Sequence, residues 1–201
     1  AYLSRLQSQG LSYDTDKNII LETTGLYGQS KVRRINPKTY EVETSINLPR
    51  QYFGEGSTFY NDKDGNRRLI MITWREQTGF IYNADTLEQL YAFQYTTTPQ
   101  FGNEGWGITY DETNQEFIVS DGSSYLYFWD RDTLEEKRKV EVTRLDGQKT
   151  QANLNELEFI GGRVCCNIWY SDHIICVDPA TGKSVREYGK TKDLHFHYYS
   201  F

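Results

Sequence analysis

Short segments rich in apolar, aromatic and β-branched residues alternate with polar turns along the chain, and no segment has the 3.6-residue spacing of an amphipathic helix. One kind of turn motif recurs four times, with its threonines 47, 47 and 48 residues apart. In each motif the first side chain can accept hydrogen bonds from backbone N–H groups two residues on, which predicts an Asx-type turn. The motifs are Asn36-Pro37-Lys38-Thr39, Asn83-Ala84-Asp85-Thr86, Asp130-Arg131-Asp132-Thr133 and Asp178-Pro179-Ala180-Thr181.

Predicted strands flank every one of these turns, and two more lie upstream in each unit. The strands around the turns cover residues 31–35 and 41–48, 80–82 and 89–95, 125–129 and 137–143, and 174–177 and 184–188. The second strands of the units cover residues 19–24, 69–74, 117–121 and 164–169. Four short strands at this period are typical of a β-propeller blade. A single four-stranded sheet cannot bury both faces, and stacking blades around an axis solves that problem.

The pattern therefore predicts an all-β chain that folds as a β-propeller of four-stranded blades. We expect one domain over residues 1–201, with repeats at about 9–48, 53–95, 101–143 and 154–189 and a tail at 190–201. Aromatic residues make up 15% of the chain, and this composition favours strands because such side chains suit a pleated, half-buried surface.

Charge and apolar run length restrict the partners. The net charge is -6 and the basic residues are scattered, so we expect neither nucleic acid nor membrane as a partner. The three cysteines, Cys165, Cys166 and Cys176, are an odd number, so at least one is free or pairs outside the chain. We expect buried structural thiols rather than a redox site, with Cys165 and Cys166 on opposite faces of a strand.

Candidate chemistry lies at one height in the innermost strands. The first strand of each blade lines the channel of a propeller, and aligning the repeats there stacks Gln9, Glu55, Trp106 and Asn155. A purely structural repeat would show one residue type at this place, so the divergence predicts a site. Strand alternation puts Glu158 on the side of Asn155, and Glu156 on the other.

Aromatic residues are expected to surround this position. Trp74 and Trp169 fall at equivalent places in two repeats, and with Trp106 and Phe53 they can form an apolar cup around a small ligand. The alternative is that each tryptophan only packs between blades. Asn155 has a similar alternative, the satisfaction of buried backbone groups. A channel carboxylate such as Glu55 is costly unless it is paired or in use.

Two further motifs have some features of metal sites. Residues 61–66 are superficially similar to a calcium loop but lack its spacing and distal glutamate, so they predict a polar hairpin turn built on Asp64-Gly65. His195 and His197 would share one face if the tail formed a strand, and a flexible tail is the preferred interpretation.

Six stretches together resemble the glutamine cyclotransferase family of plants and bacteria, over about residues 9–185. The resemblance implies a five-bladed propeller that converts N-terminal glutaminyl residues to pyroglutamyl with release of ammonia. It also implies peptide or protein substrates with N-terminal Gln, no catalytic zinc and no cofactor, a monomer, and a secreted or endomembrane location. The stretches are residues 24–30, Phe53-Gly54-Glu55-Gly56, Ile72-Thr73-Trp74, Glu104-Gly105-Trp106-Gly107, Leu154-Asn155-Glu156-Leu157-Glu158 and Asn167-Ile168-Trp169.

Carried over by position, the resemblance makes Glu55 the acid/base and makes Asn155 and Gln9 the polar substrate contacts. The aromatic lining would be Phe53, Trp74, Trp106 and Trp169. Two features depart from the family. Gln7 stands where a phenylalanine is expected, and the final blade, with an asparagine-glycine-isoleucine stretch and a lysine beside a tryptophan, has no counterpart.

Two other function classes remain open at this stage. One is a truncated, inactive propeller that only binds peptides or protein partners. The other, on fold analogy alone, is a propeller hydrolase of the lactonase kind, which would hold a divalent metal through convergent carboxylates and amides. Glu55, Asn155 and Gln9 would make a thin ligand set for such a metal.

Overall fold

The computed structural model describes residues 7–15 and 17–189, whose strands form four antiparallel sheets of four. The first two sheets contain β1 (Gln7–Asp14), β2 (Ile19–Gly25), β3 (Lys31–Ile35) and β4 (Val42–Asn47), then β5 (Gly54–Asn61), β6 (Arg67–Thr73), β7 (Thr78–Asn83) and β8 (Gln89–Gln94). The other two contain β9 (Ile108–Asp111), β10 (Glu116–Ser120), β11 (Tyr125–Asp130) and β12 (Glu136–Glu141), then β13 (Leu154–Ile160), β14 (Arg163–Ile168), β15 (Ile174–Val177) and β16 (Ser184–Tyr188).

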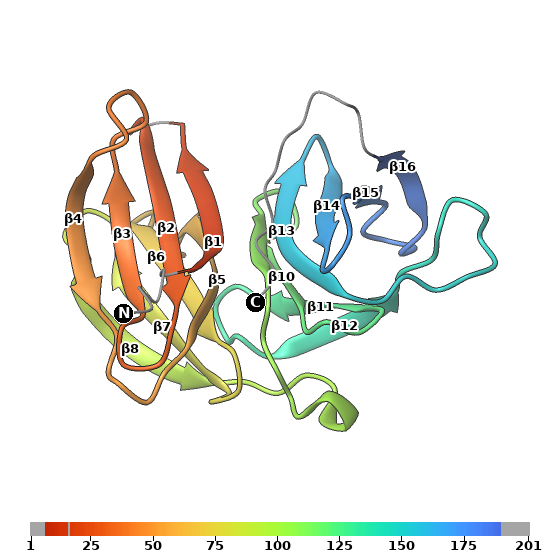
Figure 1. Cartoon of the computed structure of the whole chain (residues 1–201), viewed down its shortest axis with the longest axis horizontal. Coiled ribbons are helices and arrows are strands. Elements are labelled where there is room, and N and C mark those ends of the chain that lie inside the picture. Colours follow the sequence, from red (N-terminus) through yellow and green to blue (C-terminus); the bar gives the residue numbers. More distant parts are fainter. Residues whose placement is uncertain (1–6, 16, 190–201) are drawn as a thin grey trace, which may run out of the picture.

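Within every sheet the strands lie in chain order, and the sheets follow one another around a common centre (Figure 1). The first strands are innermost: β1 contacts β5, β5 contacts β9, and β9 contacts β13. Three apolar clusters fill the spaces between successive sheets, around Leu21 and Leu69, around Ile70 and Phe117, and around Leu126 and Leu157. The predicted propeller of four-stranded blades is confirmed, and we call the sheets blades 1 to 4.

All four predicted Asx turns are confirmed, and each joins the third and fourth strands of a blade. Asn36 Oδ1 accepts hydrogen bonds from the backbone N–H of Lys38 at 2.9 Å and of Thr39 at 3.2 Å. Asn83, Asp130 and Asp178 accept the same pair of bonds in their own turns. The first side chain therefore satisfies two backbone donors in every blade.

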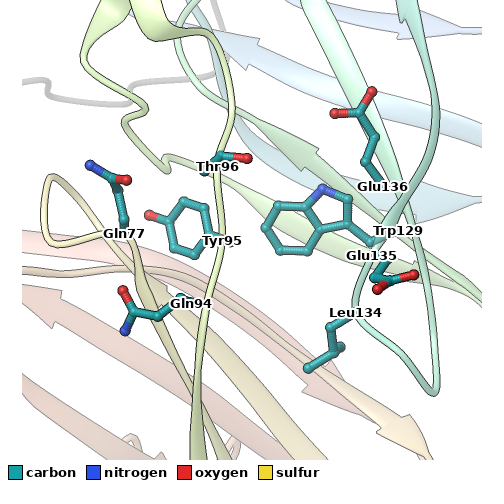
Figure 2. A pocket seen from close by; sticks show the side chains of 8 residues that line it. All are labelled: Gln77, Gln94, Tyr95, Thr96, Trp129, Leu134, Glu135 and Glu136. Carbon is teal, nitrogen blue, oxygen red and sulfur yellow. The ribbon is translucent and has the colours of Figure 1, made fainter.

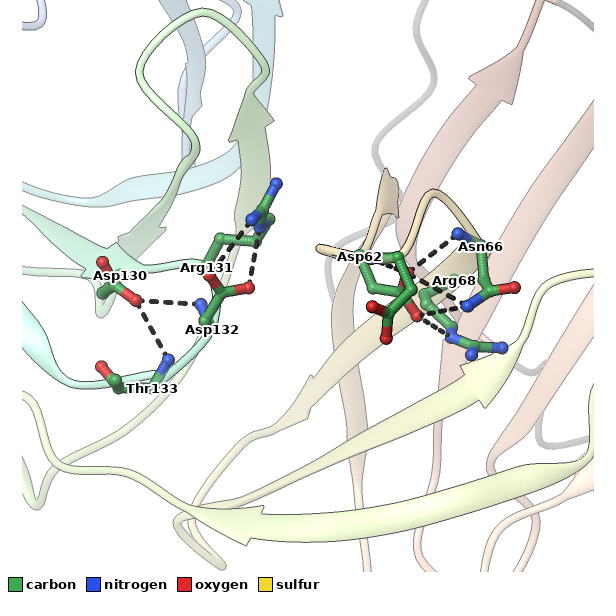
Figure 3. Close-up of polar contacts among 8 residues, drawn as sticks. Asp62, Asn66, Arg68, Asp130, Arg131, Asp132 and Thr133 are labelled. Atoms are coloured by element: carbon green, nitrogen blue, oxygen red, sulfur yellow. Dashed lines mark hydrogen bonds and ion pairs between the residues drawn. The ribbon is translucent and has the colours of Figure 1, made fainter.

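The loop at residues 61–66 is a hairpin turn, as predicted, and Asp62 organises it (Figure 3). Its carboxylate accepts hydrogen bonds from the backbone N–H of Asp64 at 3.0 Å and of Asn66 at 2.8 Å, and from Arg68 Nε at 2.8 Å. These bonds hold the pKa of Asp62 below its usual value against the opposing effect of burial. Figure 3 also shows the equivalent role of Asp130 in the turn of blade 3.

The expectation of buried structural thiols holds for Cys166 alone, because the other two cysteines are bonded to each other. Cys165 in β14 and Cys176 in β15 are cross-strand partners and form a disulfide. Cys166, on the opposite face of β14, is a free thiol buried in the apolar cluster between blades 3 and 4. The reason is the register: it aligns Cys165 with Cys176, which spacing along the chain alone does not reveal.

Helix is nearly absent from the described residues. It amounts to one 3-10 turn at Pro99–Phe101 in the connection between blades 2 and 3. Nowhere in residues 7–15 and 17–189 is there a helix with the length and apolarity that a membrane crossing requires. His195 and His197 lie outside the described residues.

Candidate functional site

The four stacked positions of the innermost strands all lie in local irregularities of the sheet. In β5, Glu55 and Gly56 together oppose one residue of β6, and in β13 Asn155 and Glu156 together oppose one residue of β14. In β1, Gln9 is the extra residue between Ser8 and Gly10. Such β-bulges bend a strand and redirect its side chains, and they are common beside active sites.

Blade 3 has the same two-against-one arrangement just before β9 begins. Trp106 donates its backbone N–H to the carbonyl of Ser120 at 2.9 Å, and Ser120 donates its own to the carbonyl of Gly107 at 3.0 Å. The sequence alignment of Gln9, Glu55, Trp106 and Asn155 therefore corresponds to one structural feature in every blade.

Direct contacts join these bulges around the channel. Thr23 of blade 1 donates its hydroxyl to the Glu55 carbonyl. Gly56 donates its N–H to the Trp106 carbonyl at 2.8 Å. Ser120 of blade 3 donates its hydroxyl to the Asn155 carbonyl at 2.7 Å. The structure thus brings the backbones of three of the predicted residues into one arc.

Glu55 is a buried carboxyl group with 7% of its surface exposed. Burial raises its pKa well above the usual value, and the nearby carboxylates of Glu104 and Glu76 raise it further. A carboxyl in this setting keeps its proton to a higher pH than an exposed one does. That property suits a general acid or base.

Aromatic rings gather where the innermost strands begin, at the end of the channel that we call the mouth. The Phe53 ring lies 5.5 Å from the Trp74 ring, and Trp106 lies 5.2 Å from Trp169, between ring centroids. Glycines make room for two of these rings. A Cβ at Gly25 would lie 2.0 Å from the Phe53 ring, and one at Gly122 would lie 2.6 Å from Trp106.

The exposed fractions of these side chains differ across the mouth. Phe53, Trp74 and Trp106 are half-buried, whereas Trp169 has 42% of its surface exposed. The backbone N–H of Trp169 donates to the Asn153 carbonyl at 2.9 Å, as that of Trp74 donates to the Phe53 carbonyl at 3.0 Å. The equivalence of Trp74 and Trp169 that the repeats predict is therefore visible in their backbone contacts.

Two carboxylates of the mouth were not assigned a role from the sequence. Oε2 of Glu104 accepts hydrogen bonds from Trp74 Nε1 at 2.7 Å and from Trp106 Nε1 at 2.9 Å. Glu76 accepts one from the Tyr27 hydroxyl at 2.7 Å and one from the Phe53 backbone N–H at 3.3 Å. Both residues lie in connections without a two-residue period, so alternation gives no direction for their side chains. The position of Glu104 two residues before Trp106 was the available signal.

The expected direction of Glu156 is wrong. Its Oε1 accepts a hydrogen bond from the Leu11 backbone N–H of blade 1 at 3.2 Å, and its charge interacts with that of Glu55. The bulge at Asn155 and Glu156 breaks the alternation on which the expectation rested. Burial raises the pKa of Glu156 well above its usual value and that of Glu158 to about 7. Asn155 and Gln9 are half-buried in their bulges.

Within residues 7–15 and 17–189 no group of three or more His, Cys, Asp or Glu side chains is placed to hold a metal ion. The mouth combines aromatic rings with the carboxylates of Glu76 and Glu104, and the buried carboxyl of Glu55 lies near both of these carboxylates.

A separate cavity of about 340 Å³ lies on the outer seam between blades 2 and 3 (Figure 2). Tyr95 and Trp129, with ring centroids 5.4 Å apart, form its buried aromatic wall. None of the seven predicted site residues lines it, so the cavity is distinct from the mouth. The other lining residues are Gln77, Gln94, Thr96, Leu134, Glu135 and Glu136.

These features define a class of protein: a β-propeller with a buried acid in an innermost strand, near the carboxylates of Glu104 and Glu76 that bond to aromatic residues of the mouth. The family model described as glutamine cyclotransferase matches residues 3–194. The chain is also 34% identical over 175 residues to a glutaminyl-peptide cyclotransferase of Arabidopsis thaliana, a match that covers 87% of this chain and 50% of that protein. The chain belongs to the glutamine cyclotransferase family.

One solved structure agrees with this assignment, and a second shares the fold. The crystal structure of Myxococcus xanthus glutaminyl cyclase matches with a TM-score of 0.74 at 28% identity, over 90% of this chain and 69% of that one. Kuenenia stuttgartiensis hydrazine synthase matches with a TM-score of 0.58 at 12% identity, over 93% of this chain and 50% of that one. The latter likeness concerns the fold alone. The chain spans half the length of the Arabidopsis relative.

Proposed function

We propose that the protein cyclises N-terminal glutaminyl residues of peptides or proteins to pyroglutamyl residues and releases ammonia. The observation that carries the proposal is the buried carboxyl group of Glu55 in a β-bulge beside the aromatic mouth, in a chain of this family. In the reaction, the α-amine nitrogen bonds to the side-chain amide carbon, the carbon–nitrogen bond of the amide breaks, and the departing nitrogen leaves as ammonia.

Glu55 is the proposed acid/base. Its carboxylate takes a proton from the attacking amine and returns that proton to the departing nitrogen, so no proton is gained or lost overall. A transfer of this kind is worth about 10²–10⁴-fold in rate when the pKa of the group lies near the working pH. The raised pKa of Glu55 favours such a role.

Asn155 is the proposed donor to the oxygen of the amide carbon, where negative charge develops as the amine attacks. Loss of one such donor costs roughly 10²–10³-fold in rate. Gln9 is the second polar contact to the substrate. Phe53, Trp74, Trp106 and Trp169 hold the glutaminyl side chain bent toward its own amine, which makes the reaction effectively unimolecular.

An ammonia-release assay with a short Gln-initiated peptide tests the proposal. We expect the parent protein to release ammonia and form a pyroglutamyl peptide, and Glu55→Gln to abolish turnover while its far-ultraviolet circular dichroism stays unchanged. Glu112→Gln, which changes an exposed glutamate in the turn after β9, is the matched control. Turnover by Glu55→Gln would remove Glu55 from the role. Peptide binding without any ammonia release by the parent protein would support the binding-only alternative instead.

A further inference from the structure

Glu104 lies in the connection between blades 2 and 3, and its backbone is fixed on both sides. Its carbonyl accepts a hydrogen bond from the Thr97 hydroxyl at 2.7 Å. The next residue, Gly105, donates its N–H to the Trp74 carbonyl at 2.8 Å, where any side chain would collide with the Tyr95 hydroxyl. The carboxylate that starts from this fixed backbone is 16% exposed.

Both oxygens of the Glu104 carboxylate accept hydrogen bonds from residues of the mouth. Oε2 accepts the N–H groups of Trp74 and Trp106 at 2.7 and 2.9 Å, and Oε1 accepts Arg75 Nε at 3.0 Å. The Arg75 guanidinium in turn stacks over the Trp74 ring, 3.6 Å from its centroid. Two indoles from consecutive blades therefore direct their N–H edges at one atom.

An indole carries a single hydrogen-bond donor, so a fixed acceptor for that donor restricts the orientation of the ring. Because one oxygen accepts both donors, the two rings are fixed relative to each other as well as to the backbone. Hydrogen bonds to a charged acceptor are also stronger than those to a neutral one. Without this acceptor each half-buried N–H would have to find another partner, and the ring would turn to do so.

We propose that Glu104 is a positioning residue for the cyclisation, which sets the orientation of Trp74 and Trp106 in the substrate cup. The inference rests on the proposed function, because it assigns the two indoles to the substrate. A different role for the same contacts is a simple structural tie between blades 2 and 3. Such a tie would affect how much protein is folded but not how well the folded protein holds its substrate.

Two substitutions distinguish the effect of the hydrogen-bond acceptor at residue 104 from the effect of its negative charge. Glu104→Gln keeps one oxygen that can accept both indoles, whereas Glu104→Ala removes the acceptor. We expect Glu104→Ala to raise KM for a Gln-initiated peptide about tenfold or more, with a smaller change in kcat, and to reduce the tryptophan bands in near-ultraviolet circular dichroism. We expect Glu104→Gln to retain those bands and to change KM by about threefold or less. Glu112→Gln is the exposed control, expected to match the parent protein.

A double-mutant cycle tests the coupling directly. In a Trp74→Phe, Trp106→Phe background no indole N–H remains at Glu104, so we expect Glu104→Ala to change KM much less there. Parent-like KM and circular dichroism for Glu104→Ala would overturn the proposal, as would an equal effect in both backgrounds.

The dissociation constant of the same peptide, measured by calorimetry, keeps this test separate from that of the proposed function. If the parent protein binds the peptide without turnover, the cyclase proposal fails, while weaker binding and altered tryptophan bands in Glu104→Ala still support the positioning role. If Glu104→Ala does not fold, Glu104→Gln and Glu104→Asp are compared instead. The shorter side chain of aspartate moves the accepting oxygen away from the two indole N–H groups. Equal KM for these two variants would then overturn the positioning role.

Discussion

The backbone N–H of Leu11 in β1 donates a 3.2 Å hydrogen bond to Oε1 of Glu156 in β13, so the first and fourth blades contact each other directly. The other carboxylate oxygen, Oε2, is buried without a hydrogen-bond partner among the described residues. One oxygen therefore stabilises the arrangement of the blades, while the burial of the charge opposes it.

We expect Glu156→Gln and Glu156→Ala to affect stability in different ways. The amide keeps an acceptor for Leu11 and removes the buried charge, so Glu156→Gln is expected to be as stable as the parent protein or more stable at pH 8. Glu156→Ala leaves the Leu11 donor without its acceptor and is expected to be about 1–3 kcal/mol less stable than Glu156→Gln. Urea denaturation of the three proteins measures this. Equal stability of the two variants would show that the bond contributes nothing.

More of the fold than of the candidate site could be predicted from the sequence, and the turns show the reason. Asn36 and its three equivalents bond to backbone groups two and three residues away, so a local motif is sufficient to predict them. The disulfide could be predicted only from the register of β14 with β15, and that register cannot be read from the sequence.

For the candidate site, the sequence aligns residues correctly only where the repeat sets their position. Glu55 and Asn155 are aligned by the repeat, and the structure places them in equivalent bulges. The role of Glu104 was not predicted because its side chain starts from a connection without a two-residue period. The expected direction of Glu156 was wrong because its bulge breaks strand alternation.

The buried carboxyl of Glu55 makes the stability of the folded protein depend on pH. Its pKa in the folded protein is raised above the value of 4.5 for an unperturbed carboxyl, so the folded state retains a proton that the unfolded chain loses. The contribution of Glu55 to the free energy of unfolding is therefore fully present below pH 4.5 and is lost as the pH rises toward the folded pKa. We expect Glu55→Gln, which has no such loss, to be more stable than the parent protein at pH 8.

The gain for Glu55→Gln is expected to grow as the pH rises from 4.5 toward the folded pKa, because the parent protein loses stability over that interval and the amide does not. Thermal denaturation at pH 8 and at pH 4 measures it, and the difference between the two proteins should vanish at pH 4. Glu112→Gln serves again as the exposed control. A difference of equal size at both pH values would show that it does not arise from this proton.

Glycines let the innermost strands approach one another closely. A Cβ at Gly56 would lie 2.7 Å from the backbone of Trp106, Gly107 and Ile108, and one at Gly107 would lie 2.3 Å from the Asn155 carbonyl oxygen. Backbone atoms cannot move aside as a flexible side chain can. We therefore expect Gly56→Ala and Gly107→Ala each to cost about 1–3 kcal/mol or more in the free energy of unfolding.

Gly189 provides the matched control for these glycines. A Cβ there would have its nearest contact at 3.4 Å, with the His173 ring, and the residue is exposed. We expect Gly189→Ala to change the free energy of unfolding by about 0.5 kcal/mol or less. Chemical denaturation of the three variants compares them. Similar effects at Gly189 and Gly56 would contradict the role of close strand contact.

The disulfide predicts a particular thiol count. Without reductant, we expect one reactive thiol per chain in denaturant, that of Cys166, and almost none in the folded protein because Cys166 is buried. After reduction in denaturant, three thiols should react. Replacing both Cys165 and Cys176 by serine is expected to cost about 2–4 kcal/mol in the free energy of unfolding. Three reactive thiols in unreduced, denatured protein would show that the bond does not form.

The two ends of the propeller are built on different principles. The end opposite the mouth carries four turns of one design, each closed by its own Asn or Asp. Two of these turns are also bonded to the preceding blade: Asp85 accepts hydrogen bonds from Lys17 and Arg34, and the Pro179 carbonyl accepts one from Arg138 at 2.9 Å. At the mouth every connection is distinct and is bonded to its neighbours. One end of the propeller is therefore built from a repeated unit, whereas a change in any one connection at the mouth also alters the contacts of the connections beside it.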